Sequence, residues 1–180
     1  MEFLELAQKR YSCRKFLDKE VEKEKIYKIL EAGRLAPTAC NFQPQRILVV
    51  TDREKQKALK ECTKFTFDAP VILVVCYDKE ESWKRKYDGQ DGGIVDASIV
   101  TTHMMLEIAQ LELGSTWVGS FDPNKARNIL NIPDNLEIVN LLPFGYPAED
   151  GAESAMHNQR KTIEQIVSWN NFTCHIDKKC

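Results

Sequence analysis

Hydrophobic residues recur along the chain with two different periods, and the changes of period mark the predicted elements. Spacings of three and four residues give a helix one apolar face, whereas short uninterrupted apolar runs are typical of strands covered on both sides. Helices and strands intermix without strict alternation, which favours the α+β class. Helices are predicted over residues 2–9, 21–35, 53–62, 94–113, 123–131 and 162–169, and strands over residues 46–51, 70–77, 116–121 and 136–146.

Residues 94–113 form the most hydrophobic of the predicted helices. Apolar side chains occupy most of its sides, so we expect a central, buried helix that ends at Gly114. Residues 79–93, by contrast, are rich in charge, glycine and aromatic side chains and follow neither period. We expect this segment to form an exposed excursion or lid.

The composition is that of an ordinary globular chain. The 180 residues include 25 Lys and Arg against 27 Asp and Glu, which leaves a formal net charge of −2. This balance gives no electrostatic basis for bulk binding of nucleic acid or of a membrane surface. The longest apolar run, residues 69–77, is about half of what a bilayer-spanning helix needs, and the acidic N-terminus is unlike a secretory signal. We expect one cytoplasmic domain over residues 1–170 and a flexible tail over residues 171–180.

The first segment with candidate chemistry is Arg10-Tyr11-Ser12-Cys13-Arg14. In an extended stretch alternate side chains point the same way, so two guanidinium groups and one hydroxyl would share a face. Arginine forms forked, charge-assisted hydrogen bonds to phosphate oxygens, and the hydroxyl can add another. The alternative is a solvated basic turn after a helix, which the triplet alone favours.

Two further segments are polar and turn-forming. Residues 36–44 place Thr38, Asn41 and Gln43 between two prolines, which offers hydrogen-bond donors and acceptors on a stiffened backbone or marks a simple helix-stop loop. In residues 114–122, Gly119 either lets the backbone approach a flat ring or forms a bulge at a strand end.

Taken in order, these segments resemble the nitroreductase family of flavin mononucleotide (FMN) enzymes. The resemblance rests on the Arg-x-Ser-x-Arg segment, Ala36-Pro-Thr-Ala-Cys-Asn-Phe-Gln-Pro44, Gly114-Ser-Thr-Trp-Val-Gly119, Phe144-Gly-Tyr-Pro147 and the late Arg160. It implies an α+β homodimer with a central, mostly antiparallel sheet flanked by helices. It also implies that FMN lies at the dimer interface, in two sites that both chains build.

The family likeness assigns cofactor-binding roles to thirteen residues. Arg10, Ser12 and Arg14 match the phosphate and ring-edge binders, with Arg14 the cation expected near N1 and O2 of the ring, and Arg160 matches the late phosphate-binding arginine. The partner subunit would lend a loop containing Pro37, Thr38, Ala39, Asn41 and Gln43. Trp117, Val118, Gly119 and Ser120 match the segment whose backbone lies against the ring, where an amide would face N5.

Some positions depart from the pattern of longer family members. Those members carry an Asn and a Lys where this chain has Cys62 and Phe65, and a Lys where it has Asn158. The helices that cover the flavin are shortened here, which leaves Trp83 and Tyr87 as the visible lid. Substrate choice therefore does not follow from the family.

The family likeness implies an oxidoreductase. NAD(P)H would dock on the flavin as co-substrate, and a small-molecule acceptor such as a nitroaromatic or quinone would follow in the same pocket, which predicts ping-pong kinetics. Neither a catalytic side chain nor a metal site is predicted. A specialised reaction within the family, a flavin-binding redox sensor with little turnover, and a plain interaction domain are the alternatives.

The remaining candidate residues favour structural roles. His103 lies within an apolar helix, and His157 is the histidine near a proposed site. Cys13 and Cys40 fall in the two flavin segments, where small buried fillers are more common than redox-active thiols. The remaining cysteines are Cys62, Cys76, Cys174 and Cys180, and the six together form no metal-binding spacing.

Overall fold

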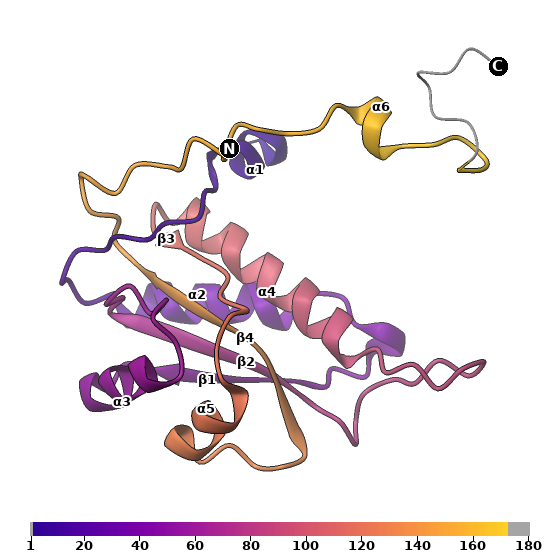
Figure 1. Ribbon diagram of the computed structural model, residues 1–180, viewed down its shortest axis with the longest axis horizontal. Coiled ribbons are helices and arrows are strands. Elements are labelled where there is room, and N and C mark those ends of the chain that lie inside the picture. The colour runs from indigo at the N-terminus through magenta and orange to yellow at the C-terminus, as the bar shows by residue number, and fades with distance from the viewer. Residues whose placement is uncertain (1, 173–180) are drawn as a thin grey trace.

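The computed structural model describes residues 2–172, and the chain forms four strands and six α-helices within that range (Figure 1). Cys174, Cys180 and most of the predicted flexible tail lie outside the described residues. The elements are α1 (Phe3–Lys9), α2 (Lys23–Arg34), β1 (Gln45–Val50), α3 (Arg53–Ala58), β2 (Val71–Asp78), α4 (Gly93–Gln110), β3 (Gly114–Ser115), α5 (Pro123–Leu130), β4 (Leu136–Gly145) and α6 (Ile163–Ile166), with 3-10 turns at Ala39–Asn41 and Leu59–Glu61.

The strands form one antiparallel sheet in the order β1-β2-β4-β3. Every residue of β2 is buried, as its uninterrupted apolar run predicted. Because side chains alternate along a strand, Val71, Leu73 and Val75 face one core, which also contains residues of α2 and α4. Ile72 and Val74 face a second core, shared with α5 and the turn after α3. Helices thus cover both faces of the sheet, which confirms the α+β prediction.

Helix α4 lies along the centre of the structure, and two glycines allow it to pack closely against its neighbours. A Cβ on Gly93 would come within 2.0 Å of the Tyr77 ring, and a Cβ on Gly33 of α2 within 2.9 Å of Met104. The 18 residues of α4 span about 27 Å at the usual helical rise. Its two ends therefore support different regions of the surface.

The chain between α4 and α5 differs from its prediction. The helix ends at Gln110, and Glu112 takes the left-handed turn (φ 61°), so Gly114 is not the residue that ends it. Gly114 instead begins β3, where an added Cβ would lie 2.6 Å from the Cys13 Cβ. The predicted strand over residues 116–121 reduces to a single bridge between Val118 and Leu141.

The C-terminal helix is also shorter than predicted. Instead of residues 162–169, α6 covers Ile163–Ile166 and has no buried residue. Ile163, Ile166 and Trp169 are exposed, because no described part of the chain covers this arm, which extends away from the body in Figure 1. Within residues 2–172 there is no helix with the length and apolarity that crossing a membrane requires.

Candidate functional site

The Arg10–Arg14 segment is extended, as predicted, and it lies beside β3. Ser12 bridges Ser115 in a parallel arrangement, and the Cys13 N–H donates to the Ser115 carbonyl at 3.0 Å. Cys13 is fully buried between two more exposed neighbours, and its Sγ donates to the Lys15 carbonyl. This alternation directs the intervening cysteine inward and leaves Ser12 and the arginines on the more accessible side.

Arg10 and Arg160 interact electrostatically although 150 positions separate them in the sequence. The pKa of Arg10 is lowered, first by partial burial and then by the positive charge of Arg160. The Arg160 Nη1 donates only to the carbonyls of Met156 and Gln159, and that of Arg14 to the Ser12 carbonyl. Among the described residues, no carboxylate pairs with any of these three arginines. Two neighbouring cations without a counter-charge favour the binding of an anion.

Contacts with α1 hold the segment that carries Arg160. His157 Nε2 lies 2.9 Å from the Gln8 carbonyl, and the His157 ring meets the Tyr11 ring edge-on. The Tyr11 hydroxyl donates to the Gly151 carbonyl at 3.2 Å. His157 is therefore a structural residue of the site. The chain that follows β4 runs back past α1 (Figure 1).

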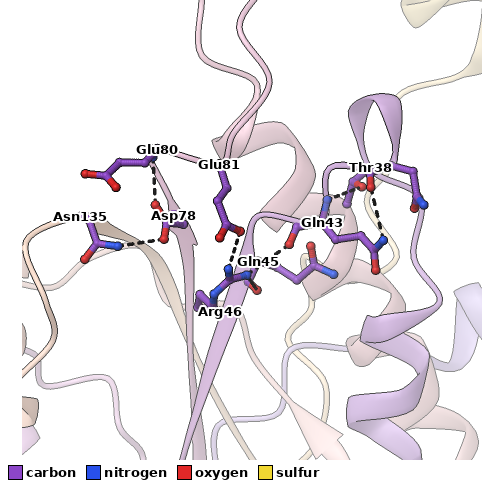
Figure 2. Close-up of polar contacts among 9 residues, drawn as sticks. Thr38, Gln43, Gln45, Arg46, Asp78, Glu80, Glu81 and Asn135 are labelled. Carbon is purple, nitrogen blue, oxygen red and sulfur yellow. Dashed lines mark hydrogen bonds and ion pairs between the residues drawn. The ribbon is translucent and has the colours of Figure 1, made fainter.

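The loop over residues 37–43 has an unusual backbone. Cys40, Asn41 and Gln43 all adopt left-handed φ angles, between 50° and 56°, which L-residues other than Asn rarely take. Thr38 Oγ1 accepts from the Gln43 N–H at 3.1 Å, and Gln43 Nε2 donates to the Asn41 carbonyl. Figure 2 shows Gln43 between Thr38 and Arg46, whose guanidinium donates to the Gln43 carbonyl at 3.2 Å and pairs with Glu81. Hydrogen bonds among its own polar groups thus shape the loop, and this shape leaves the Asn41 and Gln43 side chains exposed.

This loop and the arginine segment lie at opposite ends of α4. The Ala39 N–H donates to Asp96 Oδ1, in the first turn of the helix, at 2.9 Å. Arg10, by contrast, lines a small cleft with Ala109, Gly114 and Ser115, next to the last turn of α4 and β3. About 20 Å of helix, from Asp96 to Ala109, therefore separates the two groups within one chain. The structure places Arg10 and Ser12 beside β3, with Arg160 within electrostatic range of Arg10. It places Pro37, Thr38, Ala39, Asn41 and Gln43 elsewhere.

Residues 117–120 continue from β3 along the edge of β4 and lead towards α5. Val118 is buried and exchanges two backbone hydrogen bonds with Leu141, at 2.9 and 3.0 Å. The Ser120 carbonyl accepts from the buried Thr63 hydroxyl at 2.7 Å. Between these anchors Gly119 is exposed, and a Cβ there would meet nothing closer than Trp117 Nε1 at 3.8 Å. The packing of the chain itself therefore does not require a glycine at this position. The space that a Cβ of residue 119 would enter is open.

Thr63 and Asp96 were missed by sequence reasoning. Thr63 lies in a polar turn with no motif, and its role follows only from its contact with Ser120, 57 positions away. Asp96 lies in the first turn of a helix, where an acidic residue is ordinary. Its burial beneath the loop of residues 37–43 had no signal in the sequence.

The departures from the family pattern have structural explanations. Cys62 is buried, donates to the Leu59 carbonyl at 3.0 Å, and has its pKa raised by burial. Phe65 stands where a cation is usual, and Lys64 places its Nζ 5.5 Å from the Phe65 ring centroid. Asn158 Nδ2 donates to Glu153. At the position that the resemblance matches to a second cation, this chain thus has an apolar side chain with a lysine beside it.

The predicted excursion forms a short hairpin. Lys84 bridges Asp91, and the Gly92 N–H donates to the Trp83 carbonyl. At the base, Asp78 accepts from the side chain of Asn135 and from the Glu80 N–H (Figure 2). Tyr87, near the tip, is 95% exposed, so its side chain packs against little of the described chain.

Comparison with known proteins gives a consistent result. The sequence model of the Nitroreductase family matches residues 7–68 and 57–146. A protein of Archaeoglobus fulgidus assigned as an NADH dehydrogenase/NAD(P)H nitroreductase is 35% identical over 158 residues, which are 83% of this chain and 87% of that protein.

Solved structures agree over a larger share of the chain. A nitroreductase family protein from Clostridium difficile 630 is 42% identical, with a TM-score of 0.89, and the match covers 95% of this chain and 99% of that one. An FMN-dependent nitroreductase from Clostridium difficile R20291 is 30% identical, with a TM-score of 0.79, over 94% of this chain and 100% of that one.

Proposed function

The chain belongs to the nitroreductase family, and on that premise we propose that it is an FMN-dependent oxidoreductase that passes electrons from NAD(P)H to a small acceptor such as a nitroaromatic or a quinone. The observation that carries the proposal is that the positive charges of Arg10 and Arg160 act on each other, while no carboxylate of the described residues pairs with either. Such a pair is unfavourable for the empty protein. It becomes favourable when an anion binds.

The residues present fit the phosphate of FMN. A phosphate monoester carries between one and two negative charges near neutral pH and has three strong acceptor oxygens. Arg10 and Arg160 would bind these oxygens, and the Ser12 hydroxyl is available on the same segment. Arg14, with no carboxylate partner in residues 2–172, is the cation for the pyrimidine edge of the ring.

The flavin site needs a second copy of the chain. The loop of residues 37–43 lies at the other end of α4 from Arg10, so it cannot reach the flavin of its own subunit. A homodimer would bring the loop of one subunit to the arginines of the other. Exposed apolar side chains support such an interface, and they include Tyr27 and Leu35 beside α2, Ile94 and Val95 on α4, and Ile163, Ile166 and Trp169 on the C-terminal arm.

The protein would mainly bind and orient. When bound, FMN supplies the redox chemistry, taking a hydride from NAD(P)H and giving electrons to the acceptor. The backbone at Gly119, held by Val118 and by the Thr63–Ser120 hydrogen bond, would present its N–H to the ring edge in the open space described above. No side chain is needed as an acid or base, and one pocket would serve donor and acceptor in turn.

Three of the four cysteines in residues 2–172 give the redox-sensor alternative little support; Cys40 is exposed, so the expectation of a small buried filler is wrong at that position. Cys13 and Cys62 are buried and donate to backbone carbonyls, and burial raises the pKa of Cys62 and takes that of Cys76 to about 12. A thiol with a raised pKa is a poor nucleophile near neutral pH. We therefore place turnover ahead of thiol signalling.

The first experiment is the visible spectrum of the purified protein, with identification of the chromophore released by heat. We expect oxidised-flavin bands, release of FMN, and rapid bleaching when NADH or NADPH is added without oxygen. A colourless protein that takes up no added FMN would contradict the proposal. A yellow protein that neither nucleotide bleaches would instead support a flavin-binding sensor.

A further inference from the structure

We propose that Asp96 is a positioning residue that fixes the shape of the loop of residues 37–43, and thereby sets the affinity of the flavin site to which that loop contributes. The inference rests on the proposed function for its consequence. The contact between Asp96 and the loop is independent of that function and can be tested in the protein without flavin.

Asp96 is an unusual carboxylate. It is 2% exposed, and its Oδ2 is buried without a hydrogen-bond partner in the described part of the chain. No lysine, arginine or histidine of residues 2–172 forms an ion pair with it. Burying a charge without a counter-ion is costly, and the N-terminus of a helix offsets only part of that cost. The contact that Asp96 does make is the 2.9 Å hydrogen bond from the Ala39 N–H.

The loop needs such an anchor because its backbone is strained. Three of its residues, Cys40, Asn41 and Gln43, have left-handed φ angles, and strained conformations persist only where the surroundings hold them. The other contacts are local, since Thr38 bonds to Gln43 within the loop and Arg46 lies just after it. The bond to Asp96 joins the loop to a helix that begins about 50 residues later.

The anchor also determines where the exposed side chains point. Ala39 begins the turn that contains Cys40 and Asn41, and the Phe42 N–H donates back to the Ala39 carbonyl. If the Ala39 amide is released, the turn loses its fixed point and Asn41 and Gln43 lose their preset directions. A preformed loop binds its ligand without a further ordering cost, so release should weaken the affinity for flavin.

A simpler role for Asp96 would be to stabilise α4. Thr101 provides a matched control, because it is fully buried on the same helix, donates to the Ala97 carbonyl at 2.8 Å and accepts from Asn140 at 3.0 Å. Within the part of the chain that the structure describes, Thr101 forms no hydrogen bond with residues 37–43. Thr101→Val therefore removes buried polar contacts of α4 and leaves the loop anchor in place.

The test compares Asp96→Ala, Asp96→Asn and Thr101→Val in three measurements: thermal unfolding without flavin, titration of the apoprotein with FMN, and hydrogen exchange of the Ala39 amide. With Asp96→Ala we expect exchange at Ala39 to become about tenfold faster and FMN binding about tenfold weaker, because one buried hydrogen bond is lost. Asp96→Asn keeps an acceptor oxygen and should stay within about twofold of the wild type in both. Thr101→Val should lower the unfolding temperature and leave FMN affinity unchanged.

Three results would overturn the inference: unchanged exchange at Ala39 in Asp96→Ala, an equal loss of FMN affinity in Thr101→Val, or a loss in Asp96→Asn as large as in Asp96→Ala. If Asp96→Ala does not fold, Asp96→Ser replaces it, because the shorter side chain keeps a polar group but falls short of Ala39. A wild-type protein that binds no FMN would contradict the proposed function. Exchange at Ala39 would still decide whether Asp96 anchors the loop.

Discussion

The two ends of α4 carry two different kinds of binding surface. At the carboxyl end, Arg10 and Arg160 are brought together from the two ends of the chain and are held by backbone pairing with β3 and by contacts with α1. At the amino end, residues 37–43 form a short, strained loop anchored on Asp96. The first surface is suited to an anion and the second to a group with neutral polar edges. A ligand with both features would need one surface from each of two chains.

The largest effect is expected from removing the charges at the carboxyl end. Arg10→Ala combined with Arg160→Ala removes two charge-assisted contacts and should weaken FMN binding by about 1000-fold. Riboflavin lacks the phosphate, so its weaker affinity should be the same for the double variant and the wild type. Fluorescence titration with both flavins measures this. An equal loss for riboflavin would show that these arginines hold the fold or the ring.

The comparison also predicts complementation between chains. In a heterodimer of Arg10→Ala and Asp96→Ala chains, purified with two different tags, one site would combine the intact arginines of one chain with the intact loop of the other. The second site would carry both defects. We expect one FMN per dimer at wild-type affinity, measured by titration against both homodimers. Two weakened sites would mean that the loop acts within its own subunit.

Much of the fold was predictable from the sequence because local periodicity encodes it. The apolar run of residues 70–77 predicted a strand covered on both sides, and β2 is buried at every position. The predictions that failed concern elements whose ends are determined by tertiary contacts. Gly114 was predicted to stop a helix, yet it is required by the approach of Cys13, and the helix predicted over residues 162–169 shortens because none of the described residues covers its apolar side chains.

The candidate site divides in the same way. The alternation in Arg10, Ser12 and Arg14 indicated an extended basic face as one of two interpretations, because that pattern is local, and the structure shows the extended form. The meeting of Arg10 with Arg160, and the burial of Asp96 under a loop 57 positions earlier, depend on long-range packing that no motif carries. The assignments of the thirteen residues to FMN stay predictions.

An intermediate effect is expected at Gly119, between the two surfaces. An added Cβ meets nothing within 3.4 Å, so Gly119→Ala should leave the unfolding temperature of the apoprotein unchanged or slightly raised. Flavin binding should weaken about tenfold, because the methyl group occupies the space in front of the backbone. Gly145→Ala is the contrasting variant, since its Cβ would lie 2.6 Å from Pro70 Cδ and should destabilise the protein itself. Wild-type FMN affinity in Gly119→Ala would mean that the ring lies elsewhere.

The smallest effect should have the opposite sign. Partial burial lowers the pKa of Arg10 most, and repulsion by Arg160 adds to it. Arg160→Ala relieves that repulsion, so the apoprotein should gain a few tenths of a kcal/mol in its free energy of unfolding, and added salt should abolish the gain. Arg53→Ala removes an arginine paired with Asp18 and should bring no such gain. Denaturant unfolding at low and high ionic strength measures both. If Arg160→Ala destabilises the apoprotein, the arginine serves the fold. If Arg160→Ala stabilises the apoprotein and also weakens FMN binding, the two arginines destabilise the empty protein and serve the ligand. Such a cost to stability is expected of a binding site and not of a contact that holds the fold.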